Sequence, residues 1–184
     1  IDKKLLGSGR IDIILQTDEI DSFKSIDVFT DIDQRINELE QLPLIYGSHD
    51  IRLPVRMIHQ GFSNSLNENN PSIFPTSNDA LEQELLFLEF SRGETSKTDV
   101  LSNVVDFDYK NARIELITHQ LPSSKINELI STIDTTFSNW AHGSVIITGS
   151  QFLSFILGSG THFEHYKYAI MLTIISINYI QCII

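Results

Sequence analysis

The chain has 184 residues, of which 41% are hydrophobic, and its formal net charge is −11. This length and composition suit one compact domain, or two small subdomains that share a core, and argue against a wholly disordered chain. The acidic excess argues against nucleic acid or an anionic membrane surface as a partner, because both bind Lys/Arg-rich patches. Cys182 is the only cysteine, which excludes an intrachain disulfide and a cysteine-based metal cluster.

The first half of the chain predicts one strand followed by three helices. Arg10–Thr17 alternates apolar and polar residues, as a half-buried strand does. Apolar residues then recur at steps of three and four, which predicts an amphipathic helix over Ile26–Leu42 that Pro43 ends. A second helix is expected over Asp50–Phe62, before a loop rich in Ser, Asn and Pro. Asp79–Phe90 is apolar on more than one side, so we expect a well-buried third helix.

The second half predicts a hairpin, a helix and a last strand. Val100–Phe107 and Ala112–Thr118 are expected to be strands joined by the tight turn Asp108–Asn111. An amphipathic helix is expected over Ser123–Trp140, and Ser144–Thr148 is expected to be a short strand. This order of elements predicts an α+β fold with ferredoxin-like β-α-β parts, in which helices pack on one face of a sheet.

Two further expectations concern the core and the division of the chain. Ile130 and Phe137 lie on the apolar stripe of the helix over Ser123–Trp140, so both should be buried against the sheet. We expect residues 1–160 to form the α+β domain, and residues 161–184 to form a linker helix and the start of a transmembrane helix.

The C-terminal stretch Tyr166–Ile184 is long and apolar enough to begin a membrane span, and Lys167 is its only charge. Tyr166, Lys167 and Tyr168 match the aromatic and cationic pattern of a membrane interface. Because the chain starts at Ile1 without a Met or a signal peptide and stops within this run, we expect a fragment of a longer protein. The alternative is a helix buried in a soluble core, which its polar residues Thr173, Ser176, Asn178 and Gln181 also fit.

No group of residues specifies an active site. His162, Glu164 and His165 are close in sequence, but they lack the spacing of helical zinc motifs and a third ligand group. Asp106 and Asp108 stand two residues apart, so an acid/base pair of carboxylates on one hairpin edge stays open as an alternative. We expect no enzymatic activity, no metal and no cofactor.

The stretch from Val104 to Asp134 resembles the periplasmic loop of predicted exporters of the resistance-nodulation-division (RND) superfamily, in its MMPL-like branch. That branch shows an acidic hairpin of the form D-x-D-Y-x-x-A-R, whose matching residues here are Asp106, Asp108, Tyr109, Ala112 and Arg113. In the family an amphipathic helix follows, then a strand that ends in Thr-Gly, here Thr148 and Gly149, and a long helix that enters the membrane. The order of the upstream helices is also similar, so the resemblance covers the chain from about Arg10.

The resemblance implies a porter-like domain on the extracytoplasmic, periplasmic side of the inner cell membrane. Such a domain takes part in substrate capture and passage by conformational change. The implied partners are membrane lipid, reached through the C-terminal helix, the other transmembrane helices of the parent exporter, and a hydrophobic or lipid-like substrate. A homo-oligomer is left open. The alternative function is that of a membrane-anchored accessory or interaction module without transport activity.

Overall fold

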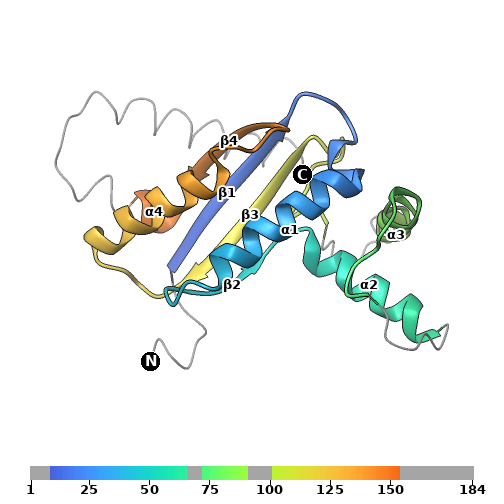
Figure 1. Ribbon diagram of the computed structural model, residues 1–184, viewed down its shortest axis with the longest axis horizontal. Coiled ribbons are helices and arrows are strands. Elements are labelled where there is room, and N and C mark those ends of the chain that lie inside the picture. The colour runs from blue at the N-terminus through green and yellow to red at the C-terminus, as the bar shows by residue number, and fades with distance from the viewer. Residues whose placement is uncertain (1–8, 66–71, 91–100, 154–184) are drawn as a thin grey trace.

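The computed structural model describes residues 9–65, 72–90 and 101–153, which form a mixed α+β fold around a four-stranded antiparallel sheet (Figure 1). The strands are β1 (Gly9–Thr17), β2 (Ile45–His49), β3 (Asn111–Thr118) and β4 (Gly143–Thr148), in the order β2-β3-β1-β4. The helices are α1 (Ile26–Glu40), α2 (Arg52–Ser65), α3 (Asn78–Phe90) and α4 (Ser123–Phe137), with the short 3-10 helix η2 (Ser22–Lys24).

The chain crosses the sheet twice, each time through a helix. β1 and β2 both pair antiparallel with β3, so they run parallel to each other with β3 between them, and α1 connects them. In the same way β3 and β4 run parallel on the two sides of β1, and α4 connects them. α2 and α3 are inserted between β2 and β3, and Figure 1 shows them beyond α1, away from α4.

Alternation along the two central strands creates the core. Every second residue of β1 is buried, and Ile11, Ile13 and Leu15 are completely so. β3 alternates in the same way. α1 and α4 lie over this face (Figure 1), and their apolar stripes join the strand residues in one hydrophobic cluster. The opposite face carries charged pairs such as Arg113 and Asp12, whose Nη2 and Oδ1 atoms are 2.7 Å apart.

Most of the predicted elements are confirmed, with shifted ends. β1, β3 and β4 lie where the alternation placed them, and the four predicted helices exist. α1 ends at Glu40 instead of Leu42, because the backbone turns at Leu42 ahead of Pro43. α2 begins at Arg52 instead of Asp50 and continues to Ser65, and α4 ends at Phe137 instead of Trp140.

The prediction of a strand over Val100–Phe107 is wrong for its described residues. Residues 101–104 form a turn, and only Val105 makes an isolated bridge, to Ala112. The amide nitrogens of Val104 and Val105 both donate to the carbonyl of Leu101, which coils the backbone. Pairing with β3 is therefore limited to this bridge and its two hydrogen bonds, from the N–H of Asp106 to the Asn111 carbonyl and from the N–H of Arg113 to the Val104 carbonyl. The fourth strand is instead β2, whose sequence IYGSH has too little alternation to be recognised.

The expected burial is wrong at two places. α3 buries Leu81 and Leu85, but Leu86, Phe87 and Phe90 are exposed, because the helix packs through one side only. In α4, Phe137 is buried as expected, whereas Ile130 is only partly buried. The middle of the apolar stripe, which faces the sheet, is formed by Ile126, Leu129 and Ile133, and Ile130 lies at the edge of this stripe.

The expected transmembrane segment, Tyr166–Ile184, lies outside the described residues. In the part of the chain that the structure describes, no helix combines the length and the apolarity needed to cross a membrane.

Candidate functional site

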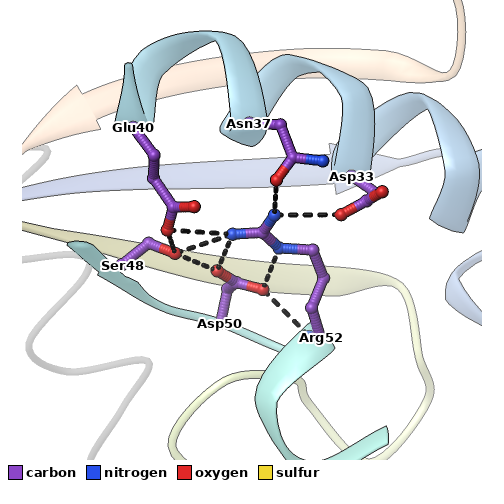
Figure 2. A network of polar contacts seen from close by, with 6 residues as sticks. All are labelled: Asp33, Asn37, Glu40, Ser48, Asp50 and Arg52. Carbon is purple, nitrogen blue, oxygen red and sulfur yellow. Dashed lines mark hydrogen bonds and ion pairs between the residues drawn. The ribbon is translucent and has the colours of Figure 1, made fainter. Parts of the chain in front are cut away.

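Arg52, the first residue of α2, is the centre of the largest polar network among the described residues (Figure 2). Its side chain is 9% exposed and lies between α1 and the end of β2. Figure 2 shows partners converging on the guanidinium from both elements, namely Asp33, Asn37, Glu40, Ser48 and Asp50.

Every N–H of the Arg52 guanidinium has an acceptor. Nε donates to Oδ1 of Asp50 at 2.9 Å, and Nη1 donates to Oδ1 of Asp33 and Oδ1 of Asn37, both at 3.0 Å. Nη2 lies 2.8 Å from Oγ of Ser48, 3.1 Å from Oδ2 of Asp50 and 3.2 Å from Oε1 of Glu40. A guanidinium has five N–H donors, so none is left for a ligand. The network therefore joins elements and does not present a binding group.

The charges of the network keep Arg52 ionised. Burial would lower the pKa of Arg52, but the hydrogen bond and charge of Asp50, the hydrogen bond of Asp33 and the charge of Glu40 together raise it above its ordinary value. Three carboxylates face one guanidinium, and two of them, Asp33 and Glu40, keep 25% and 32% of their side chains in solvent. Solvent therefore screens part of the remaining negative charge.

Local structure places each partner. Asp33, Asn37 and Glu40 are four and three residues apart on α1, so they form a polar stripe along one side of that helix. Asp50, which is 2% exposed, accepts a hydrogen bond from the backbone N–H of Arg52 through Oδ1 at 2.9 Å and so caps the start of α2. The sequence alone did not predict this network. The polar stripe on α1 was its visible signal, but a stripe does not identify its partner.

A cavity of about 250 Å³ opens beside the network. One wall is polar and consists of the network residues together with Arg56. The other wall is apolar and is formed by Leu53, Ile73 and Phe74. Phe74 is held edge-on against Phe29 of α1, with ring centroids 5.4 Å apart. The cavity thus combines a charged and an apolar side.

A second polar chain fixes the apolar wall of this cavity. Nδ1 of His59, on α2, is 2.6 Å from Oε1 of Glu84 on α3, and Nε2 of His59 is 3.0 Å from Oγ of Ser72. The hydroxyl of Ser72 donates to the carbonyl of Phe74 at 2.7 Å. Glu84 is 5% exposed, and its Oε2 is buried without a hydrogen-bond partner among the described residues.

The hydrogen bond that the Ser72 hydroxyl donates argues against a nucleophilic role for this serine. Ser, His and Glu at these distances have the composition of a hydrolytic triad, in which the serine gives its proton to the histidine. Here the single proton of Ser72 is directed to the carbonyl of Phe74. His59 therefore donates to Ser72 through Nε2, while its Nδ1 contacts the carboxyl group of Glu84. The arrangement ties α2, α3 and the segment 72–74 together.

Glu84→Gln is expected to stabilise the protein progressively, relative to wild type, as the pH rises above the ordinary glutamate pKa of 4.5. Burial raises the pKa of Glu84, and the hydrogen bond and charge of His59 lower it only in part. A folded-state pKa above the unfolded value favours the protonated form, so this stability is present below the unfolded pKa and is lost as the pH rises through the folded pKa. The expected gain of the variant is about 1.4 kcal/mol for each pKa unit of the shift.

Urea unfolding between about pH 4 and pH 6 measures this difference, in a range below the ordinary midpoint of histidine titration. Glu82→Gln is the matched control, since Glu82 is exposed on the same helix. A Glu84→Gln difference that stays constant over this range contradicts the burial argument.

The structure places the motif residues Asp106, Asp108 and Tyr109 in the turn before β3. Asp106 accepts hydrogen bonds from the backbone N–H groups of Lys110 and Asn111 at 2.8 and 3.0 Å, so it closes this turn. Asp108 is exposed. Tyr109 is completely buried, with φ 50°, and its carbonyl accepts from the N–H of Phe23 at 3.1 Å. Asp106 and Asp108 therefore have different surroundings, and Asp106 has a structural role.

The other motif residues lie on β3 and at the end of β4, the two strands that pair with β1. Ala112 is buried, and Arg113 donates through Nε to Oδ1 of Asp12 at 2.9 Å. Thr148 pairs with the same Asp12 from the other side of β1. Gly149 has φ 113°, and a Cβ on it would lie 2.9 Å from the carbonyl oxygen of Arg10, so the backbone approach requires glycine. The structure thus brings Arg113 and Thr148 together around Asp12, apart from the turn of Asp106.

Tyr166, Lys167, Tyr168, His162 and His165 lie outside the described residues. Among residues 9–65, 72–90 and 101–153, no cluster of His, Cys, Asp or Glu has the arrangement of a metal site. No protein-family model and no curated protein matches this sequence.

Proposed function

We propose that this chain is an extracytoplasmic, porter-like domain of a membrane exporter of the RND superfamily, MMPL-like branch. In this role it takes part in the capture and passage of a hydrophobic or lipid-like substrate by conformational change, without bond-making chemistry. The observation that carries the proposal is the strand order β2-β3-β1-β4. Two β-α-β units, each split by a strand of the other, support the ferredoxin-like arrangement that the family resemblance implies.

The polar contacts between helices and strands also support movement of the domain as one rigid body. The saturated Arg52 network fastens α1 to β2 and α2. α3 is fastened to the same body, because Oδ1 of Asn78 accepts from the N–H of Ile26 at 2.7 Å and Oε1 of Glu89 lies 3.3 Å from Nζ of Lys24. Packed bodies joined in this way move rigidly, as transport by rocking requires. The apolar wall of the adjoining cavity suits contact with a hydrophobic substrate.

The location is tested by labelling a single cysteine in intact cells. Phe107 is 80% exposed, so Phe107→Cys is introduced into the complete gene, with its other cysteines, Cys182 among them, replaced by serine. We expect a membrane-impermeant maleimide to label Cys at this position in intact spheroplasts. The parent without Phe107→Cys controls for background, and labelling that appears only after lysis overturns the extracytoplasmic placement.

Transport is tested with a hydrophobic dye. Cells that express the complete gene are expected to accumulate less Nile red than cells that express the same gene lacking residues 9–153. Equal accumulation, with both proteins present in the membrane at the same level, contradicts a role of this domain in export.

A further inference from the structure

α3 is apolar on two opposite sides, and the described structure covers only one of them. Leu81 and Leu85 are buried in the core, whereas Leu86, Phe87 and Phe90 are 49%, 55% and 75% exposed. Positions 86 and 87 are four and three residues before 90, so the three side chains adjoin one another on the helix surface. We call these three residues the outer face of α3.

The outer face differs from ordinary surface apolarity in being contiguous. Single exposed hydrophobic residues are normal in folded proteins, but adjoining large ones mark interaction sites. A helix that is apolar on all sides is normally buried on all sides. Phe87 also lies against Phe62 of α2, with ring centroids 5.5 Å apart at an interplanar angle of 77°, so the apolar surface continues toward α2.

The charges around the outer face identify the kind of partner. Asp79 and Glu82 are exposed on α3, and neither has an ion-pair partner among the described residues. With a net charge of −11 on the chain, a second copy or an anionic lipid surface would meet repulsion here. Basic side chains beside an apolar stripe would meet attraction, which steers association and fixes orientation.

We propose that the outer face of α3 is the docking surface for an amphipathic helix of a partner protein. This helix is apolar along its contact stripe and rich in Lys or Arg beside the stripe. The contact runs from Leu86 to Phe90, and the acids Asp79 and Glu82 extend it toward the start of α3. This makes a face of roughly 16 Å, at 1.5 Å per residue over residues 79–90, which suits about three turns of a partner helix. The partner becomes a third helix beside α2 and α3, packed ridge into groove. The inference does not depend on the export function.

The test uses two amidated peptides of about 18 residues with the same leucine stripe, one flanked by Lys and the other by Glu, and the full chain. Fluorescence anisotropy is expected to show saturable binding of the Lys-flanked peptide and at least ten-fold weaker binding of the Glu-flanked one. The variant Phe87→Ser/Phe90→Ser should weaken binding of the Lys-flanked peptide by about ten-fold or more, since central aromatic residues carry most of such affinity.

Met57→Ser is the matched control, because Met57 is 62% exposed on α2 outside the outer face. It should leave the affinity unchanged. Circular dichroism of each variant verifies that it is folded. Binding that survives Phe87→Ser/Phe90→Ser in a folded protein overturns the proposal, because the peptide is then held by general charge attraction. Failure of both peptides to bind overturns it too. So does concentration-dependent dimerisation that the same double variant abolishes, since the occupant is then a second copy.

Discussion

Arg52→Met is expected to lower the free energy of unfolding by about 3–5 kcal/mol, the usual cost of removing one partner from a buried ion pair. The substitution keeps most of the side-chain volume but removes the only positive charge of the network. Asp50, whose side chain is 3% exposed, then stays buried without its guanidinium, and the three carboxylates of the network repel one another. Urea unfolding followed by far-UV circular dichroism measures the change.

Arg56→Met is the matched control, because Arg56 is exposed one turn along α2 and has no ion pair among the described residues. It should change stability by no more than about 0.5 kcal/mol. Arg52→Lys should fall between these two results, since an ammonium keeps the charge but cannot supply the five N–H donors of the guanidinium. Equal effects of Arg52→Met and Arg56→Met would show that the network contributes nothing to stability.

Gly143→Ala is expected to cost roughly 3 kcal/mol, the upper end of the range for local backbone strain. Gly143 begins β4 with φ 153°, and a Cβ there would lie 2.0 Å from the carbonyl oxygen of Gln16. The obstacle is the backbone of β1, which cannot withdraw without breaking the pairing of Thr17 with Gly143. Thermal or urea unfolding of the variant measures this loss.

Gly47→Ala distinguishes the steric clash with Gln16 from the effect of a positive φ on stability. Gly47 has φ 159°, close to that of Gly143, but nothing lies within 4 Å of its Cβ position. Its replacement should cost about 1 kcal/mol or less. If both variants lose the same stability, the positive φ accounts for the effect and the contact with Gln16 does not.

Local patterns were sufficient for the elements that face the core through regular positions. Ile11, Ile13 and Leu15 alternate with polar residues, and a strand with one buried face must alternate in this way. The apolar stripe of α1 likewise follows from the helical period of its residues. These patterns depend only on neighbours in sequence, so the sequence shows them without knowledge of the fold.

Other features depended on contacts between distant residues. β2 has only Ile45 buried and contains Gly47, so its strand state comes from pairing with β3 and not from its own period. Residues 101–105 are apolar enough for a strand, but Asp106 and the Leu101 carbonyl draw the backbone into turns. α3 was expected to be well buried because it is apolar on more than one side, yet packing reaches only one of its sides.

The α+β class, the positions of β1, β3 and β4, and the apolar stripes of α1 and α4 were all predictable from residue patterns alone. The contacts of Asp33 and Glu40 with Arg52, and of Ser72 and Glu84 with His59, became visible in the folded structure alone. Asp33 and Arg52 are separated by 19 residues, and His59 and Glu84 by 25. Periodicity reports which face of an element is buried, whereas the partner across that face depends on how the elements are packed together, which no local pattern records.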